Sequence, residues 1–153
     1  MKEREYCFAV KNINRVIEYL ESENFELVLN CHQIRTIYRN KNNTMARITE
    51  NETEAGMEIL LDFKENKLTD SPLNVRNESL ALPVTDMEAV LSILNFLEYE
   101  KDNVLIRERK TYKKNGVICE IDCYISPNAN NVVSIEGENF AEVDKLYEIL
   151  KEF

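Results

Sequence analysis

The sequence predicts a single α+β domain in which a β-sheet built from hairpins is flanked by helices. Most of the chain consists of short segments in which apolar and polar residues alternate, the pattern of strands with one buried face. The pair Asn115-Gly116 separates two such segments and is a strong hairpin signal. Three other segments carry apolar residues at helical spacing. With 153 residues, 44% of them hydrophobic, the chain is long enough to bury one core, so we expect one domain over residues 1–153.

The first ten residues are expected to form a strand with two different faces. Glu3, Glu5 and Cys7 share one face, and Tyr6 and Phe8 lie on the other. The aromatic face suits a core. Two neighbouring carboxylates suit either a solvated surface or a divalent cation.

The next elements follow in order to residue 64. A helix capped by Asn14 carries Val16, Ile17 and Leu20 and ends near residues 22–24. Two strands, 25–29 and 34–38, are separated by the polar residues 30–33, which contain His32. After a turn at 40–43, strands are expected over 44–50 and 57–64.

The second half roughly repeats the unit of a helix followed by a hairpin of charged strands. A strand over 75–82 precedes a helix that is capped by Thr85 or Asp86 and ends near residue 95. Strands 104–112 and 117–124 are joined by the turn at residues 114–116, and a further strand covers 132–138. The last expected element is a helix over 140–153, with Val143, Leu146 and Leu150 in its core stripe.

Composition excludes several classes of function. A net charge of -9 and a pI near 4.8 argue against nucleic acid or a membrane surface as a partner. No signal peptide or spanning helix fits the sequence, so we expect a cytoplasmic protein, and a homodimer is compatible with the pattern. The four cysteines show no disulfide spacing and are expected to be reduced. The single histidine, His32, excludes a histidine-based triad or a multi-histidine metal site within this chain.

Charged residues of both signs gather on one face of many strands. They are Glu3, Glu5, Arg47, Glu58, Asp62, Lys64, Arg76, Glu78, Arg107, Arg109, Glu120, Asp122, Glu136 and Glu138. Two interpretations fit. The sheet has one solvated face, or it curls into a barrel whose charged lumen binds a polyphosphate through basic side chains and Mg²⁺ or Mn²⁺ through carboxylates.

The order of short motifs resembles the CYTH superfamily of triphosphate tunnel metalloenzymes. This superfamily includes bacterial class IV adenylate cyclases, thiamine triphosphatases and inorganic triphosphatases. The matching residues are Glu3-Arg4-Glu5 for a Glu-x-Glu-x-Lys strand, Ala46-Arg47-Ile48-Thr49 for Leu-Arg-Ile-Arg, Lys64, Arg76-Asn77-Glu78, Arg107-Glu108-Arg109, Glu120-Ile121-Asp122 and Ser134-Ile135-Glu136-Gly137. The resemblance extends over nearly the whole chain.

The resemblance implies an antiparallel eight-stranded β-tunnel flanked by helices and metal-dependent chemistry on a triphosphate. The implied sites are catalytic Glu5 and Arg109; triphosphate-binding Arg47, Lys64, Arg76, Arg107 and Arg109; and metal-binding Glu3, Glu5, Glu78, Asp122, Glu136 and Glu138. The implied cofactor is Mg²⁺ or Mn²⁺. The implied reaction is triphosphate hydrolysis or nucleotide cyclisation, and the organic group on the triphosphate is not legible in the sequence.

Three motif positions depart from the family pattern. Cys7 replaces a lysine, Thr49 an arginine and Ser134 a glutamate. We expect Glu138 to replace the missing metal ligand, and Arg35 or Arg39 to restore basic charge. Because charge-assisted contacts of this kind contribute about 1.5–3 kcal/mol each, the alternative is a non-catalytic module of the same fold that binds triphosphate or polyphosphate. A third possibility is a structural domain whose lumen holds nothing specific.

Overall fold

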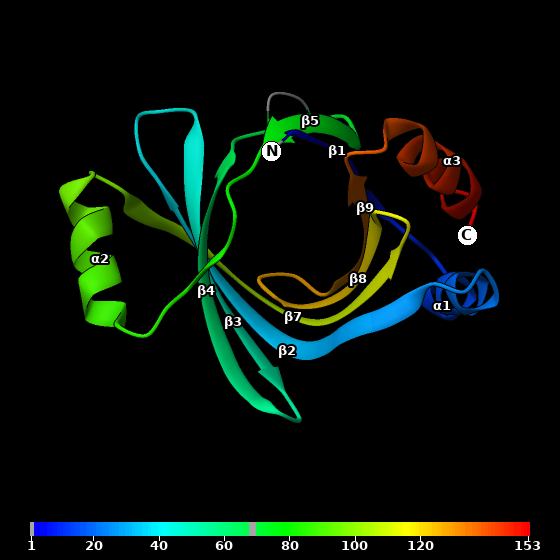
Figure 1. Cartoon of the computed structure of the whole chain (residues 1–153), viewed down its shortest axis with the longest axis horizontal. Helices are drawn as coiled ribbons and strands as arrows, with labels where there is room; N and C mark the ends of the chain where they lie inside the picture. The colour runs from blue at the N-terminus through cyan, green and yellow to red at the C-terminus, as the bar shows by residue number, and fades with distance from the viewer. Residues whose placement is uncertain (1, 68–69) are drawn as a thin grey trace.

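A computed structural model of the chain describes residues 2–67 and 70–153. In chain order the elements are β1 (Lys2–Ala9), α1 (Ile13–Ser22), β2 (Glu26–Arg39), β3 (Thr44–Thr53), β4 (Gly56–Glu65), β5 (Leu73–Asn77), β6 (Leu82–Pro83), α2 (Met87–Phe96), β7 (Glu100–Lys114), β8 (Val117–Ser126), β9 (Asn130–Gly137) and α3 (Phe140–Leu150). Figure 1 shows the strands curled around a central opening, with α1 and α3 outside one side and α2 outside the opposite side.

The strands form one antiparallel sheet in the order β5-β1-β9-β8-β7-β2-β3-β4-β6. The segment after β5 returns to β4, where Glu78 forms an isolated antiparallel bridge with Lys64. There the Ser79 N–H donates to the Phe63 carbonyl oxygen at 2.8 Å. These contacts bring the two sides of the curled sheet together, and the predicted α+β antiparallel tunnel flanked by helices is confirmed. Within the described ranges, eight strands have five or more residues and the two-residue β6 is a ninth.

Each helix begins at a side-chain cap that satisfies a free backbone N–H of its first turn. Asn12 caps α1 by accepting from the Arg15 N–H, so the predicted cap at Asn14 was two residues late. Asp86 caps α2, as expected, and Asn139 caps α3. Helix α3 ends at Leu150 rather than at residue 153. No helix in the described ranges is long and apolar enough to cross a membrane.

Two apolar clusters fill the space between the helices and the outer face of the sheet. The larger lies under α1 and α3, where Val16, Leu20 and Val143 pack on Val133 and Ile135. The smaller lies under α2. It is formed by Ala46, Ile48 and Leu94, with partly buried neighbours. Because the strands bury their apolar faces outward against helices, their polar faces are left to line the interior.

Residues 26–39 form one long strand, β2, where the sequence predicted two shorter strands over 25–29 and 34–38. All of the polar stretch 30–33 pairs with β7, and residues 32 and 33 also pair with β3 on the other side of β2. Gln33 points inward, where its amide donates to Asn51 at 2.8 Å. His32, expected in a loop, lies in the strand and contacts Glu108 through Nδ1 at 2.5 Å.

The predicted strand 75–82 is also different in the structure. β5 ends at Asn77 because the chain then leaves β1 and bonds to β4 through residues 78 and 79. This change of partner places Glu78 beside Lys64.

The hairpin between β7 and β8 has the predicted Asn-Gly turn. Asn115 and Gly116 both have positive φ, 49° and 76°, as a type I′ turn requires. Gly137 passes close to this turn, and a Cβ at Gly137 would lie 2.6 Å from the Gly116 carbonyl oxygen. The four cysteines are free.

Candidate functional site: a charged cavity inside the sheet

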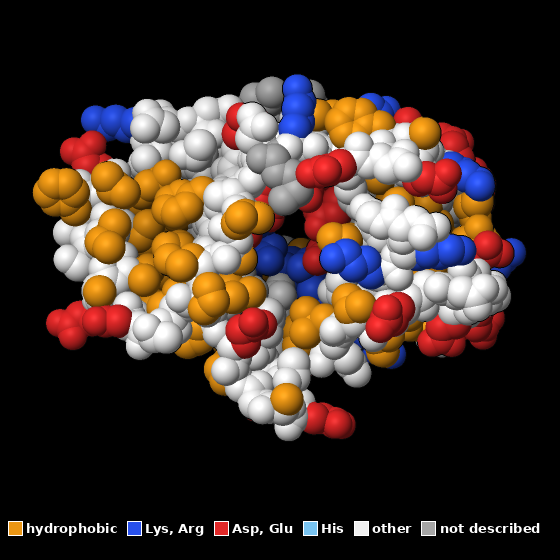
Figure 2. Space-filling model, in the orientation of Figure 1, with side chains coloured by type: hydrophobic (Ala, Val, Ile, Leu, Met, Phe, Trp, Pro, Cys, Tyr) orange, Lys and Arg blue, Asp and Glu red, His pale blue; other side chains and the backbone are white. Residues whose placement is uncertain are grey.

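The curled sheet encloses a cavity of about 620 Å³ whose wall is rich in ionisable side chains. Eight basic and six acidic residues line it, in a chain whose net charge is -9. Figure 2 shows the opening, with Lys and Arg side chains inside it and carboxylates at its edge. Eleven of the fourteen charged residues identified on the strand faces line this cavity; Glu3 lies beside it, and Glu58 and Glu138 are exposed outside it.

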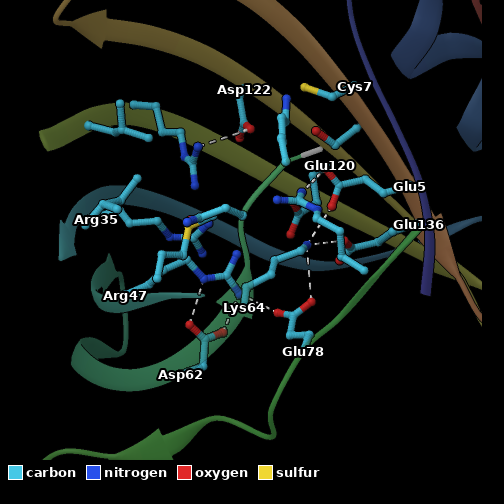
Figure 3. Close-up of a pocket in the computed structure, with 18 of the residues that line it drawn as sticks. Glu5, Cys7, Arg35, Arg47, Asp62, Lys64, Glu78, Glu120, Asp122 and Glu136 are labelled. Carbon is cyan, nitrogen blue, oxygen red and sulfur yellow. Dashed lines mark hydrogen bonds and ion pairs between the residues drawn. The ribbon is translucent and has the colours of Figure 1, made fainter. Parts of the chain in front are cut away.

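Lys64 lies at the centre of the acidic part of the cavity (Figure 3). Its Nζ lies 2.6 Å from Glu5, 3.3 Å from Glu78 and 3.8 Å from Glu136. Burial alone would lower the pKa of Lys64, but the charges of these carboxylates outweigh burial and raise it. Lys64 is thus held as a cation by residues from three strand segments.

Glu5 is balanced by two cations. It accepts a hydrogen bond from Lys64 and a second from Arg76 Nη2 at 2.9 Å. Although burial would raise the pKa of Glu5, the charges of Lys64 and Arg76 hold it below its usual range. A carboxylate with a lowered pKa is a weak proton acceptor, so Glu5 is suited to positioning its two basic partners.

Three carboxylates, two of which are neighbours of Lys64, lie close together. Glu3, Glu78 and Glu136 each offer one oxygen, and these oxygens lie within 4.8 Å of one another. Burial, and then a hydrogen bond with Glu78, raise the pKa of Glu3 to about 7. Burial and the charge of Glu120 raise the pKa of Glu136 to about 8. Burial opposes ionisation of Glu78 as well, but Arg47 and Lys64 lower its pKa to about 2.

This carboxylate group fits a hard divalent cation. Mg²⁺ and Mn²⁺ prefer oxygen ligands, and carboxylates from separate strands can approach one ion together. Glu3 also has a buried oxygen, Oε2, without a hydrogen-bond partner within the described residues. A buried unpaired carboxylate oxygen is unfavourable, and a cation would satisfy it.

A second group of charges surrounds Arg109. Its Nε and Nη2 donate to the two oxygens of Asp122 at 2.7 and 2.8 Å, and its Nη1 lies 2.9 Å from Glu120. Burial alone would lower the pKa of Arg109, but these carboxylates raise it. The bidentate pair fixes both position and charge of the guanidinium.

Arg107 is held mainly by neutral groups. Its Nε donates to Gln33 at 2.7 Å and its Nη1 to the Tyr124 hydroxyl at 2.5 Å, while Asp122 is 3.7 Å away. Its Nη2 is buried and has no hydrogen-bond partner among the residues described. Arg76 Nε is in the same state. Both atoms are N–H donors available to an anion in the cavity.

Arg47 is paired with two carboxylates. It donates through Nε and Nη2 to the two oxygens of Asp62, at 2.7 and 2.5 Å, and through Nη2 to Glu78. Arg47 therefore connects the carboxylate group to the wall formed by β3 and β4.

The structure brings together ten of the residues that the resemblance implied. Nine line the cavity: Glu5, Arg47, Lys64, Arg76, Glu78, Arg107, Arg109, Asp122 and Glu136. Glu3 joins the carboxylate group beside it. Glu5 and Asp122, for which the resemblance implies metal binding, form ion pairs with Lys64 and Arg109. Glu138 is exposed and lies beyond the end of β9, so alternation along that strand does not carry it into the cavity.

Four residues in or beside the cavity were not predicted from the sequence to be site residues. Asp62 and Glu120 were recognised only as members of a charged face, although they pair with Arg47 and Arg109. Gln33 and Tyr124, which hold Arg107, were not selected. Alternation along an unbroken strand over 26–39 would have placed Gln33 and Arg35 on the same face.

Two of the three residues that depart from the family pattern lie next to each other in the cavity wall. Cys7 and Ser134 are direct cross-strand partners on β1 and β9, and both line the cavity. A lysine and a glutamate at these positions would lie side by side. Their replacement therefore removes a cation and a carboxylate from the same region.

The fold is shared with solved structures whose names describe candidate adenylate cyclases and triphosphatases. No family model matches the sequence, and a search of curated proteins finds no match. The likeness comes from solved structures at low sequence identity.

Three similar structures illustrate this likeness. The PH1012 protein of Pyrococcus horikoshii is 19% identical, with a TM-score of 0.75 over 97% of this chain and 88% of that one. A candidate adenylate cyclase of Vibrio parahaemolyticus is 15% identical, with a TM-score of 0.66 over 97% of this chain and 83% of that one. A candidate adenylyl cyclase of Hippeastrum with a dominant triphosphatase activity is 15% identical, with a TM-score of 0.62 over 98% and 87%.

Proposed function

We propose that this protein binds a nucleotide or another triphosphate together with Mg²⁺ or Mn²⁺, and processes it as a triphosphatase or as an adenylate cyclase-like enzyme. One observation carries the proposal: buried guanidinium N–H donors that have no partner among the described residues lie in the same cavity wall as two carboxylates, Glu78 and Glu136, which converge with Glu3 beside the cavity. A triphosphate with its divalent cation supplies the complementary charges to both groups.

The chain's own residues would bind and orient such a ligand. The unpartnered donors of Arg76 and Arg107 are available to phosphate oxygens, and Arg109 is a fixed cation that would stabilise charge developing on phosphorus-bound oxygens. Glu5 would keep Lys64 and Arg76 in place. The divalent cation, when bound by Glu3, Glu78 and Glu136, would neutralise phosphate charge and polarise an oxygen nucleophile.

A second candidate is a binding module without catalytic activity. It is favoured by the paired replacements at Cys7 and Ser134, which take one cation and one carboxylate from adjacent positions in the wall. Such a protein would keep affinity for a triphosphate but would lack part of the charge arrangement needed for turnover.

The test compares two variants that carry the same chemical change. Glu136→Gln alters the carboxylate group, whereas Glu138→Gln, two residues later, alters an exposed side chain outside the cavity. Tripolyphosphate, ATP and thiamine triphosphate are offered to each protein with Mg²⁺ or Mn²⁺. Released phosphate and pyrophosphate are measured, and thermal melts are recorded on the same mixtures.

Turnover by the wild type and by Glu138→Gln, with at least a tenfold loss in Glu136→Gln, is the result expected of the enzyme. A raised melting temperature with these ligands and no turnover would instead support the binding module. No turnover and no change in melting temperature with any ligand would reject both.

A further inference from the structure

Arg35 on β2 lines the cavity, and none of the described carboxylates forms an ion pair with it. It lies directly opposite Thr49 on β3 and opposite Leu105 on β7. Its diagonal neighbours on these strands are Arg47 and Arg107, because Ile37 pairs with Arg47 and Gln33 pairs with Arg107. Arg47, Arg35 and Arg107 thus form a row of three guanidinium groups across β3, β2 and β7, here named the arginine row.

The three members of the arginine row differ in their partners. Arg47 is neutralised by Asp62 and Glu78, and Arg107 has Asp122 at 3.7 Å. Arg35 makes one hydrogen bond, from Nε to the Thr49 hydroxyl at 3.0 Å, and no carboxylate of residues 2–67 or 70–153 lies within 4.0 Å of it. Figure 3 shows its side chain entering the cavity beside Arg47.

This arrangement is electrostatically unfavourable for Arg35 without a ligand. Burial, followed by the charges of Arg47, Arg107 and Arg109, lowers the pKa of Arg35 to about 9. Burial is the larger cause and the neighbouring guanidinium groups add to it, so the Arg35 cation has lost water and is repelled by other cations. An anion between Arg35 and Arg107 would relieve this repulsion.

Arg39, the other residue expected to restore basic charge, is in a different state. Its Nε donates to Asp102 at 2.9 Å, and a second nitrogen donates to Asn66. Its charge is therefore already matched near the surface. Of the two, Arg35 is the one that faces the cavity without a carboxylate partner.

We propose that Arg35 is a phosphate-binding residue, and that its guanidinium forms an anion subsite with the unpartnered Nη2 of Arg107. This inference rests on the proposed function and assigns one phosphoryl group of the ligand to the β2–β7 side of the cavity. Thr49 orients the fork by accepting from Nε, which leaves the two terminal nitrogens of Arg35 for the phosphoryl oxygens.

The experiment measures binding of tripolyphosphate and pyrophosphate by calorimetry in EDTA, so that the anion subsite is probed without a divalent cation. Arg35→Gln removes the charge but keeps an amide that can bond to Thr49. Arg35→Lys keeps the charge and loses the fork. Arg15→Gln, an equivalent change on the exposed surface of α1, is the matched control.

We expect Arg35→Gln to weaken tripolyphosphate binding at least tenfold, Arg35→Lys to give an intermediate affinity, and Arg15→Gln to match the wild type. The melting temperature of the ligand-free protein should stay the same or rise in Arg35→Gln, because a repelled cation is removed. A purely structural arginine would show the opposite sign.

The outcomes separate the two proposals. If the wild type binds neither tripolyphosphate nor pyrophosphate in EDTA, the Arg35 subsite is overturned, whereas the proposed function, which includes a divalent cation, is tested by the turnover and melting measurements with Mg²⁺ or Mn²⁺. If the wild type binds and Arg35→Gln binds equally well, the Arg35 proposal alone is overturned. Weaker binding accompanied by a lower melting temperature without ligand would make Arg35 a structural residue and would also overturn the proposal.

Discussion

The ionisable groups inside the cavity differ in how completely their neighbours balance them. Arg109 and Asp122 form a bidentate pair with 6% and 1% of their side chains exposed, and Glu5 is shared by Lys64 and Arg76. Arg35 has no carboxylate partner among the residues described, and Glu3 keeps a buried oxygen without a hydrogen bond. The balanced pairs hold the wall together, whereas the unbalanced groups are those that a ligand would satisfy.

The largest effect is expected when a balanced pair is broken. Asp122→Ala would leave Arg109 with Glu120 alone and Arg107 without a nearby carboxylate. Loss of one partner of a buried pair costs about 3–5 kcal/mol of unfolding free energy, because the remaining charge stays buried. Urea unfolding monitored by circular dichroism measures this. A loss under 1 kcal/mol would contradict the structural role assigned to the pair.

A smaller effect is expected from adding a positive charge to the cavity wall, and it should change ligand affinity and not the free energy of unfolding. Cys7→Lys places an ammonium in the cavity wall opposite Ser134. One further charge-assisted contact contributes about 1.5–3 kcal/mol, so tripolyphosphate should bind at least about tenfold more tightly in calorimetry. Cys123→Lys, on the opposite face of its strand, is the control. Equal gains in both variants would show that the effect comes from overall charge.

The balanced pairs also predict how stability depends on pH. Burial alone would raise the pKa of Asp122, but the hydrogen bonds and charge of Arg109 hold it below its usual range. The folded protein therefore binds this proton less tightly than the unfolded chain. The stabilisation is complete above the unfolded pKa of an aspartate, near 4, and is lost as pH falls through the lowered folded value.

Unfolding free energies between pH 7 and pH 3 test this. In the wild type they should fall on the acid side, and in Asp122→Asn the fall should be shallower because one titrating group is absent. The same acid-side slope in both proteins would show that Asp122 does not contribute to it.

The smallest effect is expected where an ion pair lies at the surface. Arg39 and Asp102 are 2.9 Å apart, but 39% and 50% of their side chains are exposed. Water and salt screen such a pair, so Asp102→Ala should change the unfolding free energy by only about 0–1 kcal/mol. The same urea titration measures it. A loss as large as that of Asp122→Ala would remove the distinction between buried and exposed pairs.

Strand alternation made much of the fold and cavity predictable, because a period of two places Arg47, Arg107 and Arg109 on inner faces whatever the order of strands. Features that depend on which strands pair with each other were harder to predict from the sequence. The sequence predicted a break between strands at residues 30–33, because their pairing with β7, and that of residues 32 and 33 with β3, cannot be seen in the local sequence. Which carboxylate contacts which cation depends on the register between strands, so the basic partners of Glu5 and Asp122 could not be predicted from alternation alone.

The contrast between an acidic chain and a basic cavity wall has a kinetic consequence. The protein carries a net charge of -9, while basic residues outnumber acidic ones around the cavity. An anion approaching from solution is repelled by the outer surface before it reaches the attractive interior. Added salt screens the long approach more than the buried contacts, so moderate ionic strength should accelerate association of a multiply charged anion. Neutralising part of the anion's charge with a divalent cation before encounter should act in the same direction.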